Sequence, residues 1–212
     1  MKSKPSSLYV HIPFCKNICS YCDFKKFIYN QVRINDYFKS LFFELNQYKD
    51  RKYKSIYIGG GTPSCIDKEN LTNLLSMLGD MLHDNYKEFA IESNVEDLNE
   101  SFLNIIKESK INRLSVGIQT FNDDHIKFCN RRHNKKQAID NINKASLYIK
   151  NISVDMIYAF DKQSIKQLKE DIDIVTSLPI KHISYYSLLV EPNTILHAKK
   201  IFPFKKYPQE IS

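Results

Sequence analysis

The amino-acid sequence predicts an α/β fold built on parallel strands. Short runs of β-branched and aromatic residues alternate with longer segments of helical periodicity, and this alternation repeats about six times. Because neighbouring parallel strands need a crossover connection, usually a helix, the alternation indicates a parallel sheet. The chain has 212 residues, of which 42% are hydrophobic, and this is enough for one domain with a sizeable core. From the pattern alone, an open doubly wound sheet and a partial barrel fit equally well.

The first half of the chain supplies two strands and two helices. Leu8–Ile12 is a short apolar run and is predicted to be a strand. Ile34–Tyr48 is a predicted helix, because positions 37, 41 and 45 place apolar side chains on one face. Ser55–Ile58 is the second predicted strand and ends at a cluster of glycines. In Leu71–Leu82, five leucines recur at i, i+3 and i+4 spacing, which predicts another helix.

The second half continues the same rhythm, with apolar runs of strand length separated by helical segments. The predicted strands are Glu88–Ile91, Leu114–Ile118, Ile152–Tyr158 and His182–Leu189. The predicted helices are Glu100–Lys107 and Ile165–Val175, and the helical material after the fourth strand includes Ala138–Ile149.

Chemically unusual residues stand at or near the carboxyl ends of these strands. A cysteine cluster follows the first strand and the glycine cluster follows the second. Glu92 closes the third strand, Gln119 closes the fourth, and Asp155 and Ser187 lie on the fifth and sixth. Ligands of parallel sheets and barrels bind at this edge, so we predict that these residues share one site.

The net charge of +7 permits a nucleic-acid or anionic partner but does not require one. Lysine supplies most of the positive charge, and the charges are scattered, so we expect no nucleic-acid partner. The first ten residues lack the apolar segment of a secretory signal. No run of 18 apolar residues could span a bilayer. We therefore expect a cytoplasmic protein, in which clustered thiols are more often metal ligands or redox groups than disulfides.

Three of the five cysteines, Cys15, Cys19 and Cys22, have the spacing C-x3-C-x2-C. Three thiolates on one short loop can each bind one iron of a cubane [4Fe-4S] cluster, which leaves the fourth iron open. The competing interpretation is a zinc site with three cysteines and His11, although structural zinc sites usually present two spaced pairs. We expect Cys65 and Cys129 to be small buried residues without a ligand role.

The chain has only 5 glycines, where an average chain of this length would have about fifteen. Three of them are consecutive, at Gly59–Gly61, and are followed by Thr-Pro-Ser. The segment is neither a Walker loop nor a G-x-G-x-x-G fingerprint. Bare backbone at this position would let a small polar cofactor approach closely, and an ordinary tight turn is the alternative.

The thiol spacing, with YVHIPFC at residues 9–15 and YCDF at residues 21–24, resembles the radical S-adenosylmethionine (SAM) superfamily. The flanking residues are similar to the branch that contains oxygen-independent coproporphyrinogen III oxidase and the heme chaperone HemW. This resemblance implies a partial (β/α)6 TIM-like barrel, a [4Fe-4S] cluster on the three cysteines, and SAM on the open iron. It further implies an electron donor such as flavodoxin or ferredoxin, and heme or a porphyrin as a partner.

The resemblance also implies residues that contact SAM. GGGTPS matches the loop that holds the methionine amino group, and Glu92 matches the carboxylate that binds the ribose hydroxyls. Arg131 matches the arginine that pairs with the SAM carboxylate, and the adjacent Arg132 is the alternative. The complete set of SAM-contact residues implied by the resemblance is Tyr9, Tyr21, Gly60, Gly61, Thr62, Glu92, Gln119, Arg131, Asp155 and Ser187.

Some features depart from the family pattern. The fifth-strand motif continues as Gly-Leu-Pro in the family but as Ala159-Phe160-Asp161 here. Phe24 replaces a further cysteine of the true oxidase, as in the HemW branch. The resemblance assigns residues 1–195 to the radical SAM core. Residues 196–212 form a basic tail, and the start of a truncated C-terminal domain is one interpretation of it.

The sequence therefore leaves three hypotheses open. The first is a radical SAM iron-sulfur protein in heme metabolism or heme delivery. The second is a heme-binding chaperone without substrate turnover. The third is a truncated member of the family that lacks activity.

Overall fold

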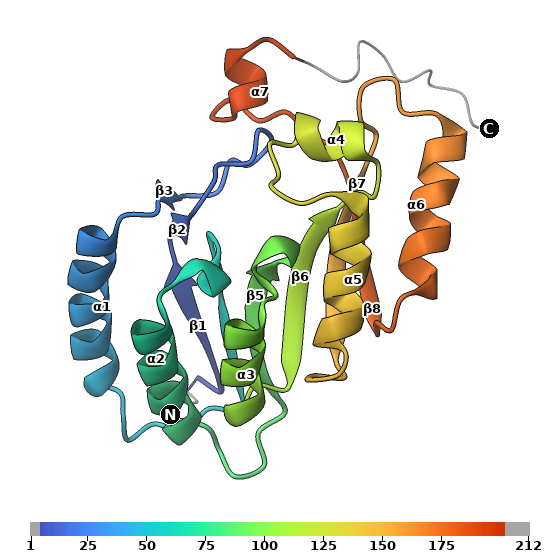
Figure 1. The fold of residues 1–212 in the computed structure, drawn as a ribbon. Coiled ribbons are helices and arrows are strands. Elements are labelled where there is room, and N and C mark those ends of the chain that lie inside the picture. Colours follow the sequence, from blue (N-terminus) through green and yellow to red (C-terminus); the bar gives the residue numbers. More distant parts are fainter. Residues whose placement is uncertain (1–4, 202–212) are drawn as a thin grey trace.

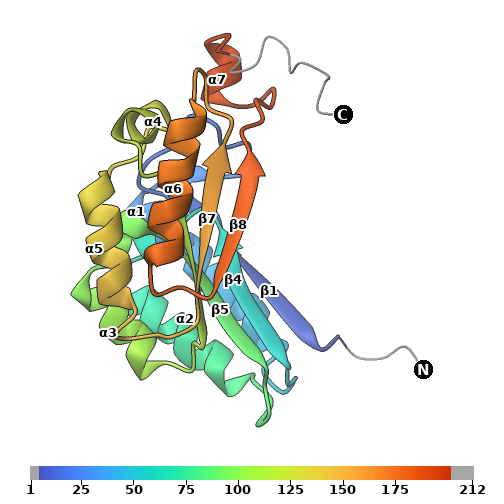
Figure 2. The same cartoon turned by 90° about the vertical axis from the view of Figure 1, so that its right-hand side faces the viewer.

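A six-stranded parallel sheet forms the centre of the computed structural model, which describes residues 5–201 (Figure 1). The strands lie in chain order, so each one pairs with the next. They are β1 (Ser7–Ile12), β4 (Ser55–Gly60), β5 (Glu88–Asn94), β6 (Arg113–Gln119), β7 (Ile152–Tyr158) and β8 (His182–Ser187). The helices cover one face of this curved sheet (Figure 2). The predicted α/β class is confirmed, and the curved sheet is the predicted partial barrel.

Alternation along the strands separates the two faces of the sheet. In β4, Ile56 and Ile58 are completely buried in the main hydrophobic core. Tyr57, between them, lines a cavity on the opposite face. β7 repeats the arrangement, with Val154 and Met156 in the core and Asp155 in the cavity. Because successive side chains of a strand point to opposite faces, one face packs against helices and the other presents polar groups.

Polar capping residues set where the helices begin. The helices are α1 (Gln31–Asn46), α2 (Lys68–Asp80), α3 (Glu100–Glu108), α4 (Asp123–Phe128), α5 (Lys135–Ala145), α6 (Ile165–Ser177) and α7 (Ile195–Ala198). Each begins after an Asn, Asp, Ser or Thr whose side chain accepts a hydrogen bond from a first-turn amide. In α5 and α6 these caps are complete capping boxes with Gln137 and Gln167. None of the helices in residues 5–201 is long and apolar enough to cross a membrane.

Several predicted boundaries were wrong. The helix predicted from Ile34 begins at Gln31, and the one predicted from Leu71 begins at Lys68, because the caps Asn30 and Asp67 precede them. The third strand continues to Asn94, so Glu92 lies within it rather than closing it. Gly59 and Gly60 also belong to a strand, pairing with His11 and Ile12 of β1, and only Gly61 leaves the sheet.

Other elements were not predicted. A two-residue parallel pair, β2 (Phe14–Cys15) with β3 (Phe27–Ile28), brackets the cysteine loop. Short 3-10 turns follow β4 at Pro63–Cys65 and β5 at Val95–Asp97. The predicted boundary at residue 195 falls at the start of α7, where Leu196 is buried in a second apolar cluster with Cys129, Ile157, Phe160 and Leu188. Residues 202–212 of the predicted tail lie outside the described residues.

Ala159 has the left-handed φ of 69° at the position where the related motif has glycine. This conformation costs a residue with a Cβ about 1–2 kcal/mol. We therefore expect Ala159→Gly to raise the free energy of unfolding by about 1 kcal/mol, measured by chemical denaturation. Ala138→Gly in the middle of α5 is the control, and it should lower stability by about 1 kcal/mol or more. A loss of stability in both variants would contradict the strain at Ala159.

Candidate functional site

A cavity of about 620 Å³ opens at the carboxyl ends of the strands. Its walls come from the cysteine loop after β1 and from the ends of the other strands of the sheet. All the predicted site residues except Tyr9 line it. Tyr9 lies on the edge strand β1, where its hydroxyl is 3.0 Å from His11 Nδ1. The structure thus brings together almost the whole set that the sequence placed at one edge.

The loop that carries the cysteines is fixed to the end of α4 and the turn after it. Asn130 Nδ2 donates to the carbonyl oxygen of Ile18 at 2.8 Å, and the side chain of Asn17 donates to the Asn130 carbonyl. Ser20 Oγ donates to the Phe128 carbonyl at 2.6 Å, and the Ser20 amide donates to the Cys129 carbonyl at 3.1 Å. These contacts join the cysteine loop to the turn that immediately precedes Arg131.

The three thiols of the loop face the same cavity. Cys15 is buried, and Cys19 and Cys22 are half-buried. Burial raises the pKa of the Cys15 and Cys22 thiols, although a hydrogen bond from Thr62 opposes the shift at Cys15. Binding of these thiols to iron as thiolates therefore releases protons. Cys65 and Cys129 are buried, as predicted, and neither lines the cavity.

The alternative zinc site requires His11 to join the three thiols. Instead, the two nitrogens of His11 lie near the Tyr9 hydroxyl at 3.0 Å and the Lys25 carbonyl oxygen at 3.4 Å. Within residues 5–201, no three His, Cys, Asp or Glu side chains converge as ligands of a single metal ion. A cubane cluster does not require the three thiols to meet at one metal ion, because each thiolate binds a different iron atom.

Two positions of the glycine segment, Gly60 and Gly61, require glycine, because a Cβ at either would collide with neighbouring atoms. Gly60 has a φ of 118°, and a Cβ there would lie 2.6 Å from the His11 ring. A Cβ on Gly61 would lie 2.7 Å from the Phe14 carbonyl oxygen and 3.0 Å from Cys15 Sγ. The Gly61 amide donates to the Ile12 carbonyl at 2.8 Å. Bare backbone therefore lets the end of β4 lie directly against the first cysteine.

Glu92 projects into the cavity from β5. Its Oε1 accepts a hydrogen bond from the Tyr57 hydroxyl at 2.7 Å, and its Oε2 accepts one from the Gly60 amide at 3.0 Å. Burial raises the pKa of this carboxyl, and the two hydrogen bonds oppose that rise. Each carboxylate oxygen can accept further hydrogen bonds, so Glu92 can also hold ligand hydroxyls.

A bulge in β6 sets the direction of Gln119. The pairing register between β6 and β7 shifts between Gly117 and Gln119, and Gln119 has a φ of 79°. A β-bulge re-aims a side chain at the end of a strand. Gln119 lines the cavity, as does Asp155 on the adjacent strand β7. Burial raises the pKa of Asp155, and hydrogen bonds from Ser184 and Ser115 oppose that rise.

The two adjacent arginines have different environments. The side chain of Arg131 is 3% exposed and lines the cavity. Arg132 is 39% exposed and pairs with Asp97 at 3.2 Å, away from the cavity lining. Of the two, Arg131 is therefore the one that can meet a ligand.

The comparison with known families agrees with this geometry. The model of the radical SAM superfamily matches residues 9–175. The chain belongs to the radical SAM superfamily.

Curated relatives within this superfamily indicate the branch that the chain resembles. Heme chaperone HemW of Lactococcus lactis is 35% identical over 212 residues, which is 99% of this chain and 56% of the relative. Heme chaperone HemW of Bacillus subtilis is 37% identical over 198 residues, with coverage of 90% and 52%. The chain thus spans about half the length of these relatives. Among solved structures, the radical SAM enzyme coproporphyrinogen III oxidase of Escherichia coli superposes with a TM-score of 0.80 at 25% identity. That match covers 93% of this chain and 47% of the oxidase.

The residues present fit the cofactors that the radical SAM superfamily implies. Three thiols on one loop are the donor set of a [4Fe-4S] cluster with an open iron. Gly60 and Gly61 line the cavity with backbone alone, which a small polar ligand can approach closely. Nε of Arg131 is buried without a hydrogen-bond partner, and it is a donor suited to an anionic group. These features together match a compact, charged ligand beside a cluster.

Sequence reasoning missed three polar residues of this radical SAM site. Asn94 lines the cavity at the end of β5 and contacts both Arg131 and Thr62. Glu96 and His133 lie behind Arg131, with Glu96 Oε2 3.3 Å from Arg131 Nη2 and 3.2 Å from His133 Nδ1. Asn94 and Glu96 follow the strand residue Glu92 by two and four positions, so an acidic and amide-rich strand end was the available signal.

Proposed function

We propose that this chain binds a [4Fe-4S] cluster through Cys15, Cys19 and Cys22, and binds SAM beside it, as the radical SAM core of a HemW-type heme-handling protein. The observation that carries this proposal is the contact between the two predicted loops. The Thr62 hydroxyl, next to the glycines, lies 3.3 Å from Cys15 Sγ. Cys15 and the residue that follows the glycines thus lie side by side in the lining of the cavity, which supports a cluster and a cofactor in contact.

The chemistry of the remaining lining residues suits the parts of SAM. Arg131 carries a buried guanidinium that can pair with a carboxylate, and Glu92 can accept hydrogen bonds from ribose hydroxyls. Asp155, Gln119 and Ser187 add polar groups on the adjacent strands. When bound and reduced, the cluster supplies the electron that cleaves SAM reductively. The role of the protein is to hold SAM beside the cluster inside this cavity.

Reduction of the reconstituted protein with dithionite in the presence of SAM is expected to yield 5′-deoxyadenosine and methionine. The product is measured by chromatography under anaerobic conditions. A control sample without iron and sulfide should give none. A protein that holds a cluster but forms no 5′-deoxyadenosine would contradict SAM cleavage and support the hypothesis of an inactive truncated member.

An apolar rim favours heme as the second ligand. Phe24, Tyr186 and Leu189 line the mouth of the cavity and are 69%, 58% and 64% exposed. A planar macrocycle can stack on such side chains. The HemW names of the relatives support heme delivery, with or without substrate turnover. Titration with micromolar heme tests whether this chain binds heme. Binding shifts the Soret band, and an unshifted band argues against a heme role for this chain.

The proposed function includes an external electron donor and a cytoplasmic location. The cluster must be reduced by an external electron donor, for which flavodoxin or ferredoxin has suitable chemistry. All five cysteines are free thiols. Free and clustered thiols persist in a reducing compartment, which supports a cytoplasmic location.

A further inference from the structure

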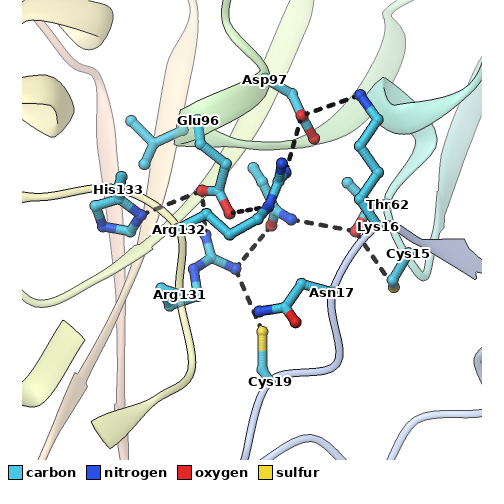
Figure 3. A network of polar contacts seen from close by, with 12 residues as sticks. Cys15, Lys16, Asn17, Cys19, Thr62, Glu96, Asp97, Arg131, Arg132 and His133 are labelled. Carbon is cyan, nitrogen blue, oxygen red and sulfur yellow. Dashed lines mark hydrogen bonds and ion pairs between the residues drawn. The ribbon is translucent and has the colours of Figure 1, made fainter. Parts of the chain in front are cut away.

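Arg131 is held in one orientation by groups from three different segments (Figure 3). Its Nη1 donates to Asn94 Oδ1 at 2.8 Å and lies 3.6 Å from Cys19 Sγ. Its Nη2 donates to Glu96 Oε2 at 3.3 Å and to the carbonyl oxygen of Gly117. Because the guanidinium is planar, these contacts fix both its position and its plane.

A second line of hydrogen bonds connects the same arginine to Cys15. Asn94 accepts from Arg131 through its Oδ1 and donates from Nδ2 to Thr62 Oγ1 at 3.2 Å. The Thr62 hydroxyl in turn donates to Cys15 Sγ at 3.3 Å. Arg131 therefore reaches one cysteine of the loop directly and a second one through Asn94 and Thr62.

Glu96 and His133 support Arg131 from behind. The side chain of Glu96 is 9% exposed and that of His133 is completely buried. Burial would raise the pKa of Glu96, but the hydrogen bond with His133 and the charge of Arg131 lower it to about 2. Glu96 is thus ionised at neutral pH and balances the buried guanidinium. An unbalanced charge at such a depth is strongly unfavourable, so removing Glu96 would release Arg131 from this position.

We propose that Glu96 and His133 are positioning residues that hold Arg131 against Cys19, so that one guanidinium supports both the cluster thiolates and the anionic end of SAM. This inference rests on the proposed function. Donors to thiolate sulfur stabilise a cluster and influence its reduction, because such outer contacts orient the ligands and balance their charge. Neither Glu96 nor His133 lines the cavity, so their effect on it passes through Arg131. Glu96 also lies 3.7 Å from Nε of the more exposed Arg132, which does not line the cavity.

The test compares reconstituted wild-type protein with Glu96→Gln. This variant keeps the side-chain volume but removes the charge that holds the guanidinium. We expect its cluster to be lost to an iron chelator about 10- to 100-fold faster, and its SAM affinity to fall by a similar factor. Loss of the cluster to the chelator is followed by visible absorbance, and SAM affinity is measured by equilibrium dialysis. Chemical denaturation of each protein confirms that only folded molecules are compared.

Glu100→Gln is the matched control, because Glu100 pairs with Lys144 at 3.4 Å on an exposed surface at the start of α3, and neither residue lines the cavity. It should change both quantities by less than about twofold. His133→Asn keeps a donor near the place of Nδ1 and should stay close to wild type, whereas His133→Ala should weaken SAM binding about tenfold. If Glu96→Gln does not fold, the two His133 variants still test whether the buried residues position Arg131.

Folded Glu96→Gln or His133→Ala protein with wild-type cluster lability and SAM affinity would overturn the proposal. So would equal effects of His133→Asn and His133→Ala, because a purely structural role does not distinguish a donor from a methyl group. A wild-type protein that takes up no cluster would contradict the proposed function itself, and this proposal with it.

Discussion

Replacing Cys15 with alanine is expected to abolish binding of the [4Fe-4S] cluster. The cluster needs a thiolate for each of three irons, and within residues 5–201 no other cysteine lines the cavity besides Cys19 and Cys22. Iron analysis after anaerobic reconstitution should therefore drop from about four atoms per chain to background. The visible absorption band of the cluster should disappear at the same time.

Cys65→Ala is the control for this experiment, because Cys65 is a buried cysteine close to the same loop. Its thiol lies 3.4 Å from the Phe14 carbonyl oxygen but does not line the cavity. Loss of this small side chain should lower stability by about 1 kcal/mol and leave the iron content unchanged. Equal iron content in Cys15→Ala and wild type would contradict the ligand assignment.

Gly61→Ala is expected to have the second largest effect. The new Cβ would lie 2.7 Å from the Phe14 carbonyl oxygen, 2.9 Å from the Phe14 amide nitrogen and 3.0 Å from Cys15 Sγ. Backbone atoms cannot yield as a flexible side chain can, so the cysteine loop must move away. We expect a loss of about 1–3 kcal/mol in the free energy of unfolding, together with poor cluster retention. Chemical denaturation and iron analysis measure the two effects.

Gly79→Ala makes the same chemical change where there is room for it. Gly79 lies in α2, and the nearest atom to its added Cβ is Lys110 Cδ at 3.5 Å, an ordinary contact. A helical Gly→Ala change should raise stability by about 0.5–1 kcal/mol and leave the cluster intact. If Gly61→Ala also retained its cluster and stability, the close approach of β4 to Cys15 would not be essential.

The sequence was most informative where a physical constraint acts over short distances. Each main-sheet strand was predicted, because β-branched runs such as Ile152–Tyr158 show their pattern locally. The sequence also predicted that the site residues lie together, since the carboxyl ends of parallel strands meet at one edge. The predicted starts of the first two helices were three residues late, because periodicity was weighed more heavily than the caps at Asn30 and Asp67.

The support behind the site depended on tertiary contacts instead. β2 and β3 are two residues long, too short to carry a recognisable period. Glu96 and His133 are 37 positions apart, and nothing in the local sequence shows that a loop and a strand end will bury them together. The bulge that re-aims Gln119 also arises only in the pairing of β6 with β7.

Electron paramagnetic resonance of the reduced, reconstituted protein tests the central claim most directly. The claim is that one cavity holds a [4Fe-4S] cluster with an open iron and SAM in contact with it. We expect the signal of a reduced cluster, with g-values that change when SAM is added. The absence of a cluster signal, or a signal that SAM leaves unaltered, would contradict the claim.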